Sequence, residues 1–199
     1  MDFGTLKSRL LATIGRAPAD VCYEMVTADI NQELRLADME ATTTLTEAAS
    51  ITLPSDFLEV VSVYRDTDPR RPLRPETPQG MHTNHQTSGI PTTYSIVDDA
   101  GTKKMQLSPA PNGSENIVLR YFAKLSDLSA DTDQNDILTN YPSIYIYGTL
   151  AHHNALIRDL ASAQAYLGAY EKAKGQARAN DRKNRMGGGP IVPVVRAAP

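Results

Sequence analysis

The chain has 199 residues, of which 41% are apolar, 22% charged and 6% aromatic, a balance that excludes disorder throughout and a fibrous repeat. Its one cysteine, Cys22, excludes an intrachain disulfide and a cysteine-based zinc site. The net charge is −3, but residues 1–140 carry 12 Lys/Arg against 20 Asp/Glu and residues 141–199 carry 8 against 3. An acidic body disfavours a sequence-specific DNA reader, and such asymmetry is typical of surfaces that meet a partner.

The first forty residues predict two helices within 2–40. Apolar residues recur at helical spacing in two runs, Phe3–Ile14 and Cys22–Leu34, with Gly15 as the stop between them. The charged residues Asp29, Glu33, Arg35 and Asp38 lie off the apolar stripe of this second run and would face water or a neighbour. This pattern predicts a helical hairpin.

Residues 41–125 change period and predict a small antiparallel sheet of about four to six strands. Thr- and Val-rich runs at 41–46 and 58–64 favour strands, and Asp98–Gly101 between two apolar runs indicates a hairpin. Prolines at 69, 72, 75, 78 and 91 exclude regular structure throughout 66–91.

From Tyr141 the helical period returns and predicts a long helix over 141–186, which would span about 65–70 Å at ~1.5 Å per residue. Alanines one turn apart in this helix would let another backbone approach closely, so we expect them to pack between subunits. These alanines are Ala161, Ala165, Ala169, Ala173 and Ala177.

Gly187–Pro190 ends this helix, and residues 187–199 are interpreted as an extended arm. Its central stretch, 191–196, is apolar and interrupted by a proline. Such a segment favours docking on another chain, by groove filling or strand addition, although a disordered terminus is an equally common reading. The residues expected at this contact are Ile191, Val192, Val194, Val195 and Arg196 of the arm, with Arg178, Arg182, Lys183 and Arg185 of the basic helix end. A solvated or salt-bridged helix end is the alternative for the basic residues.

The sequence holds no pattern that predicts catalysis, and we expect no enzyme, no cofactor and no metal. It lacks a nucleophile elbow, a phosphate-binding glycine loop and a zinc-protease motif. His82 and His85 are two ligands where a metal needs three or four, and Cys22 lies on an apolar stripe, where a thiol is usually a buried hydrophobe. No run of 18 apolar residues occurs, so no membrane partner is expected.

Six segments, taken in order, resemble the head-to-tail connector adaptor proteins of tailed bacteriophages. They are Ala28–Leu34 (ADINQEL), Leu53–Leu58 (LPSDFL), Gly89–Ile96 (GIPTTYSI), Leu107–Pro111 (LSPAP), Tyr121–Ser129 (YFAKLSDLS) and Asn140–Leu150 (NYPSIYIYGTL). Each is short, but their order and spacing extend over nearly the whole chain. The chain differs from the usual pattern in having no tryptophan on its second helix.

The resemblance implies a virion protein at the head–tail interface, assembled in the host cytoplasm. It implies a homo-oligomeric ring, typically dodecameric, that docks on the portal protein and holds a tail or nozzle protein below. Double-stranded DNA would pass through its channel during ejection without specific binding. Two other hypotheses remain: a tail-completion or terminator ring protein, and a small DNA-binding packaging accessory protein that uses the basic helix.

The expected fold class is therefore α+β, a helical bundle with an inserted small antiparallel sheet. Two N-terminal helices and the long C-terminal helix would form the bundle. We expect one domain over 1–186, followed by the arm at 187–199.

Overall fold

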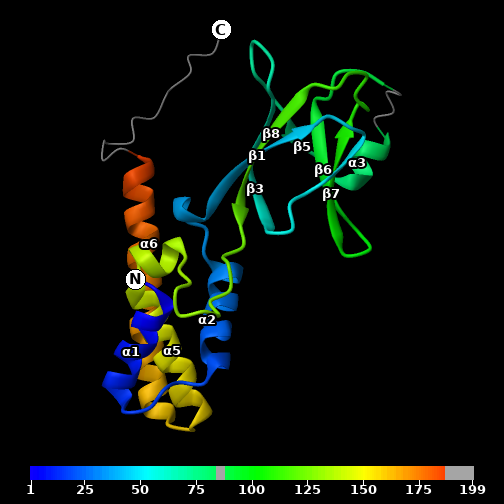
Figure 1. Ribbon diagram of the computed structural model, residues 1–199. Coiled ribbons are helices and arrows are strands. Elements are labelled where there is room, and N and C mark those ends of the chain that lie inside the picture. The colour runs from blue at the N-terminus through cyan, green and yellow to red at the C-terminus, as the bar shows by residue number, and fades with distance from the viewer. Residues whose placement is uncertain (84–87, 187–199) are drawn as a thin grey trace, which may run out of the picture. The chain divides into compact units, whose positions relative to one another are not determined.

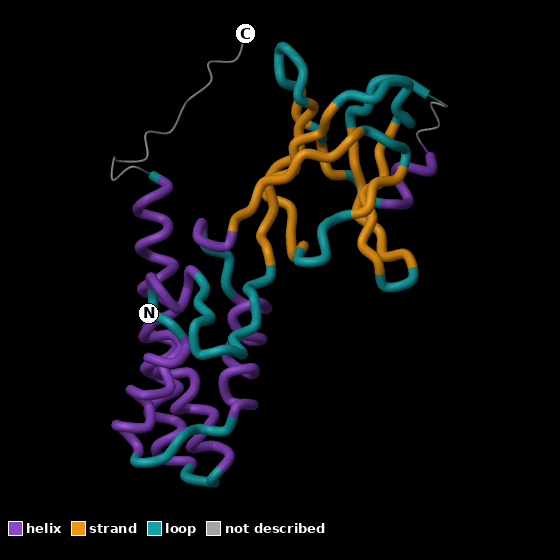
Figure 2. The backbone as a smooth tube through the Cα atoms, viewed as in Figure 1, coloured by secondary structure: helices purple, strands orange, loops and turns teal. Residues whose placement is uncertain are grey.

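The computed structural model of the protein describes residues 1–83 and 88–186, and the chain divides into two compact units (Figure 1). Unit 1 comprises residues 1–38 and 125–186, and unit 2 comprises Met39–Lys124. The β-rich insertion was placed at 41–125 from the sequence. Helices make up unit 1 and strands make up most of unit 2 (Figure 2), so the α+β class is confirmed.

Unit 1 is a bundle of five helices within the described residues, and unit 2 is inserted between its second and third helices. The helices are α1 (Phe3–Ile14), α2 (Asp20–Glu33), α4 (Asp136–Asn140), α5 (Pro142–Leu156) and α6 (Leu160–Arg185), and a 3₁₀ turn, η1 (Ala37–Met39), follows α2. Helix α5 is central, because it packs against the other four.

The predicted helix ends have clear local causes. The Asp2 carboxylate accepts a hydrogen bond from Thr5 N (2.7 Å) and caps the start of α1. At its end Gly15 takes the left-handed conformation (φ 72°) and donates its N–H to Leu11 O, a conformation that glycine adopts at little cost. The two N-terminal helices predicted within 2–40 are confirmed.

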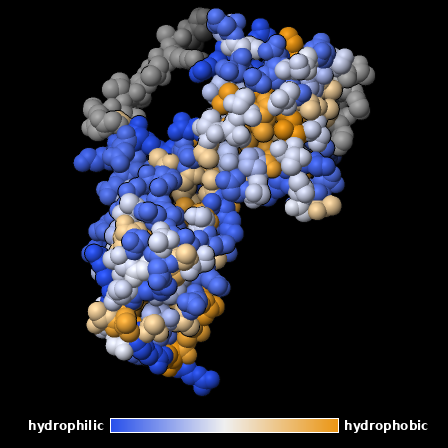
Figure 3. Space-filling model, in the orientation of Figure 1, coloured by the Kyte–Doolittle hydropathy of each residue, from blue (hydrophilic) through white to orange (hydrophobic). Residues whose placement is uncertain are grey.

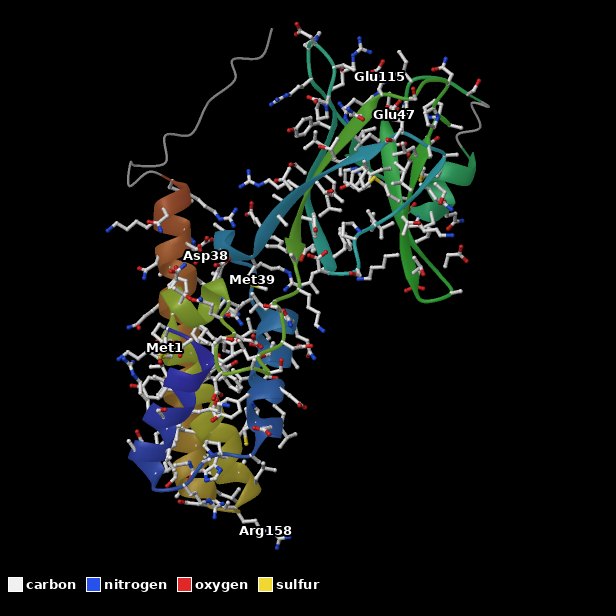
Figure 4. All side chains as sticks on the ribbon, in the orientation of Figure 1. Met1, Asp38, Met39, Glu47, Glu115 and Arg158 are labelled. Atoms are coloured by element: carbon white, nitrogen blue, oxygen red, sulfur yellow. The ribbon has the colours of Figure 1, made fainter. Side chains whose placement is uncertain are left out.

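The long C-terminal helix is present as α6, but it begins at Leu160 and not at residue 141. Residues 142–156 form α5, and the chain reverses at Ile157–Asp159 so that α6 packs back on α5. Arg158 adopts a left-handed backbone (φ 64°), and the Asp159 side chain accepts from Ser162 N (3.2 Å), capping α6. Figure 4 shows Arg158 at the end of unit 1 opposite Asp38.

The core of unit 1 requires a small residue where three helices meet. A Cβ atom added to Gly148 of α5 would lie 2.8 Å from Cγ2 of Val26 and 3.0 Å from Cε2 of Tyr170. Val26 belongs to α2 and Tyr170 to α6, so the glycine permits close packing of α5 against both.

Unit 2 contains two four-stranded sheets instead of the one sheet that the sequence predicted. The first has the order β1-β8-β3-β4 and the second β2-β7-β6-β5, and the only parallel pair among the named strands is β5 with β6. The strands are β1 (Glu40–Thr46), β2 (Ser50–Thr52), β3 (Phe57–Arg65), β4 (Arg71–Pro72), β5 (Arg74–Pro75), β6 (Thr93–Asp99), β7 (Thr102–Ser108) and β8 (Asn116–Ala123), with helix α3 (Pro78–Thr83) before β6.

The hairpin expected around Asp98–Gly101 is formed by β6 and β7, which pair from Thr93 with Ser108 to Asp99 with Thr102. A single apolar cluster from both sheets forms the core of unit 2, including Met105, Ile117 and Leu119 with no exposed surface. The strands that the described part of the proline-rich segment 66–91 contributes, β4 and β5, are two residues each, because proline cannot donate to a sheet ladder, and α3 follows them.

A buried ion pair crosses the first sheet. Arg65 donates from Nε and Nη2 to the two carboxylate oxygens of Glu47, the second at 3.1 Å, and both residues are buried. The hydrogen bonds that Arg65 donates to Glu47 raise the pKa of the guanidinium, which outweighs the effect of its burial.

Candidate functional site

Helix α6 presents different surfaces to its own unit and to the outside. Tyr170, Ala173, Lys174 and Ala177 are buried against unit 1. The first half of the helix also exposes small and apolar residues, named here the outer stripe. The outer stripe consists of Leu160, Ala161, Ala165, Leu167 and Gly168, all exposed.

The row of alanines proposed for inter-subunit packing is divided between these two surfaces. Ala161 and Ala165 are exposed and Ala169 is half-buried, whereas Ala173 and Ala177 are buried within their own chain. A residue every fourth position advances by about 40° around a helix with ~3.6 residues per turn, so the row does not follow one face. Only its first part is available to another molecule.

Large apolar side chains are exposed at the end of unit 1 where α5 turns into α6. Leu156, Ile157 and Leu160 are 55%, 49% and 67% exposed, and Leu167 further along α6 is 49% exposed. Figure 3 shows apolar surface at this end of unit 1. Single exposed leucines are ordinary on a protein surface, but a contiguous group indicates a contact with another chain.

The second half of α6 is basic, and several of its charges are bound within the chain. Lys174, only 1% exposed in its side chain, contacts Glu33 of α2 (2.5 Å) and Glu171 (2.7 Å) and lies 4.4 Å from the Tyr170 ring centroid. The Lys174 ammonium lowers the pKa of Glu33, and the two carboxylates raise the pKa of Lys174 despite burial. These contacts fix α6 to α2.

Near the end of α6 the basic residues meet the segment after α2. Arg178 Nη2 donates to Glu33 O (3.1 Å), and Asp181 accepts from Ala37 N (2.7 Å) and from Arg185 Nε (2.8 Å). Arg178, Arg182, Lys183 and Arg185 are all exposed. Part of the basic cluster therefore forms salt bridges within the chain, as the alternative reading of the sequence expected: Lys174 pairs with Glu33, and Arg185 pairs with Asp181.

The pairing of α6 with α2 also changes how the charge is distributed. Residues 1–38 and 125–199 together carry 12 Lys/Arg against 13 Asp/Glu, and residues 39–124 carry 8 against 10. Each unit is therefore almost neutral. The acidic body and basic end seen along the sequence are brought together within unit 1.

The other residues that the sequence singled out are Cys22, the arm residues and the histidine pair. Cys22 is buried, and burial raises the pKa of its thiol, so it is a core residue. The arm residues Ile191, Val192, Val194, Val195 and Arg196 and the His82–His85 side chains lie outside the described part. Within the described residues no group of three or more His, Cys, Asp or Glu is placed to hold a metal ion. Among those residues, no helix has the length and hydropathy to span a bilayer.

Sequence reasoning missed two features of this surface. Leu156 and Ile157 were assigned to the interior of one long helix, and Arg35 was expected only to face water or a neighbour, whereas it lies beside Arg178 and Arg182. The signal for the first was Asp159, an N-cap residue followed three positions later by Ser162. For Arg35 the sequence has no signal, because the contact joins segments more than 140 residues apart.

The described residues combine a helical unit with an inserted β unit, and the first half of α6 exposes an apolar stripe. The family model of the SU10 adaptor protein matches residues 1–194, and the chain belongs to this family of bacteriophage adaptor proteins. It is therefore a structural component of a phage virion. Among curated proteins, no similar sequence was found.

Proposed function

We propose that the protein forms a ring, dodecameric as in the adaptors it resembles, that joins the portal to the tail. The match of residues 1–194 to the adaptor family carries this proposal. The role is mechanical, without catalysis or a cofactor: the ring extends the DNA channel of the portal toward a tail or nozzle protein. It acts at the head–tail interface after assembly in the host cytoplasm.

The contact between copies is assigned to the outer stripe of α6. In a closed ring one face of each subunit meets a different face of the next, so each copy must present an uncovered surface. Ala161, Ala165 and Gly168 would let a neighbouring backbone approach, and Leu160 and Leu167 would supply apolar area. A stable contact needs about 800 Å² from each partner, more than the stripe alone provides.

The portal contact is assigned to the basic end of α6 and the arm that follows. Arg178, Arg182, Lys183 and Arg185 are exposed where α6 ends, and residues 191–196 would fill a groove or add a strand on the portal. The overall charge of −3 supports passage of DNA without adhesion, because a channel wall of neutral or negative charge does not hold phosphates.

A ring that terminates or completes the tail, without contact to the portal, is the alternative closest to this proposal. A DNA-binding accessory protein is less well supported. Lys174 and Arg185 have carboxylate partners inside unit 1, and that unit carries one more acidic than basic residue. The exposed cations of α6 are confined to its second half, whereas a duplex needs an extended basic surface.

The deciding experiment measures the native mass of the purified protein alone and mixed with the portal of the same phage. We expect a ring bound to the portal, and we expect a chain truncated after Gly187 to fold but lose portal attachment. A ring that forms but does not bind the portal would support the tail-completion alternative. A duplex-DNA affinity that falls steeply with salt would support the accessory protein.

A further inference from the structure

A pocket lined largely by arginine lies where α6 ends beside the segment after α2. Its volume is about 310 Å³, and it is lined by Arg35, Arg178, Asp181, Arg182, Arg185 and Met186. These residues come from two parts of unit 1 that are far apart in sequence. Four guanidinium groups and one carboxylate give the lining a formal charge of +3.

Two of the arginines are held by the last carbonyl groups of α2. Arg35 Nη1 donates to Asn31 O (3.0 Å) and Leu34 O (2.6 Å), and Arg178 Nη2 donates to Glu33 O (3.1 Å). The carboxyl end of a helix carries partial negative charge, so it stabilises cations at this position. A guanidinium has five N–H donors, and this bond uses only part of those of Arg178.

The single carboxylate in the lining is already engaged. One oxygen of Asp181 accepts from Ala37 N and the other from Arg185 Nε, so Asp181 positions Arg185 instead of neutralising the pocket. Arg182 makes no ion pair with any carboxylate of the described residues. Arg182 therefore gives the pocket a positive charge that no described carboxylate pairs.

The chemistry favours a carboxylate over a phosphate backbone. Planar guanidinium groups bind carboxylates in a bidentate manner, and the volume lies at the lower end of the ~300–1,000 Å³ typical of ligand pockets, which suits side chains but not a duplex. Holding DNA needs an extended basic surface, whereas unit 1 is almost neutral.

We propose that this arginine pocket binds side-chain carboxylates from an acidic segment of the protein on which the adaptor docks. The inference rests on the proposed function, because Met186 both lines the pocket and precedes the arm assigned to that partner. Docking would then combine an apolar contact from the arm with charge-assisted hydrogen bonds in the pocket, which would also fix the register of the two proteins.

The test uses the full chain and a fluorescent hexaglutamate peptide, with binding followed by fluorescence anisotropy. Arg182→Glu is compared with Lys183→Glu, since both make the same charge change on adjacent exposed residues and only Arg182 lines the pocket. We expect Arg182→Glu to weaken peptide binding about tenfold or more and Lys183→Glu less than about twofold. The Arg182 side chain makes no hydrogen bond or ion pair within the described residues, so circular dichroism and Tm should be unchanged.

Equal losses of peptide affinity in the two variants would overturn the assignment of the binding site to this pocket, because net charge alone would then explain binding. A 20-base-pair duplex that displaces the peptide at lower concentration than free hexaglutamate would overturn it in favour of a phosphate site. A change in native mass of the unmixed protein on Arg182→Glu would assign the pocket to another copy of this chain, against the proposal. Failure of the unchanged protein to bind the portal refutes the proposed function but leaves the peptide result intact.

Discussion

At the scale of single residues, unit 1 depends on positions where the side chain is set by its neighbours more than by its helix. Gly148 lies where α5 meets α2 and α6, while Gly168 in α6 has no atom within 4 Å of an added Cβ. Glycine costs a helix about 1 kcal/mol relative to alanine, and packing within unit 1 explains this cost at Gly148 but not at Gly168.

Gly148→Ala should lower the free energy of unfolding by about 1–3 kcal/mol, because the new methyl group overlaps Val26 and Tyr170. Gly168→Ala is the matched control and should raise it by about 0.5–1 kcal/mol, since it gains helix propensity in open space. Urea denaturation of the two variants measures both. Stabilisation by Gly148→Ala would show that the three helices do not pack this closely.

His153 gives unit 1 a dependence on pH. It is 5% exposed on α5, and burial, followed by the charge of Arg16, lowers its pKa below 6.5. As the pH falls below about 6.5 the unfolded chain takes up a proton that the native chain resists, so the free energy of unfolding falls with the pH.

Urea midpoints measured between pH 7.5 and 5.5 should therefore decrease, by no more than about 1.4 kcal/mol per pH unit from this one group. His153→Gln should reduce the slope in that window. His152→Gln is the control: His152 is partly exposed beside Asp29 (Nε2–Oδ2 3.0 Å), and this variant should keep the slope because His153 remains. An unchanged slope in His153→Gln would assign the effect to other groups.

At the scale of elements, the reversal between α5 and α6 decides the shape of unit 1. The apolar spacing continues from Leu150 through Ile157 to Leu160, so periodicity predicts one helix. The chain instead turns at Arg158, where the left-handed backbone costs a side-chain-bearing residue roughly 1–2 kcal/mol. Packing of α6 on α2 and α5, including Lys174 with Glu33, offsets this cost.

Arg158→Gly should be more stable than Arg158→Ala by about 1 kcal/mol, because both variants lose the arginine side chain and only glycine accepts φ 64° without strain. Thermal unfolding of the pair measures the difference. If Arg158→Ala were as stable as Arg158→Gly or more stable, residues 156–160 would form a continuous helix and α6 would not turn back.

Local signals made most elements predictable, and long-range contacts explain what was missed. The Asp98–Gly101 hairpin and the Gly15 stop depend on a few adjacent residues, so the sequence predicted them correctly. The division of the β residues into two sheets, the Glu47–Arg65 pair and the Arg35 pocket depend on residues distant in sequence. The alanine row was half misplaced because its four-residue spacing was taken as one face.

At the scale of the whole molecule, the positive charge of the last sixty residues is a property of the sequence and not of a separate body. Folding places the basic helix against the acidic second helix, and the charge left over is concentrated at the arginine pocket. What unit 1 leaves uncovered on α6 is apolar and small near Leu160 and basic near Arg182. The two halves of one helix thus suit two partners of different chemistry.

The outer stripe predicts how the proposed ring can be broken without unfolding its subunits. Leu160 and Leu167 are 67% and 49% exposed, so Leu160→Ser with Leu167→Ser should change the monomer by less than about 0.5 kcal/mol but remove apolar area from the contact between copies. We expect native mass spectrometry to show loss of the ring, or a rise of its assembly concentration by about tenfold or more.

Two comparisons separate this contact from a general loss of surface apolarity. Met25→Ser changes a residue of α2 that is 40% exposed and lies off the stripe, so the ring should persist. Ala165→Phe adds bulk where we infer close approach of a neighbouring backbone, and it should break the ring even though it adds apolar area. A ring that survives both the serine pair and Ala165→Phe would place the contact elsewhere on the subunit, because a tightly packed interface tolerates neither lost area nor inserted volume.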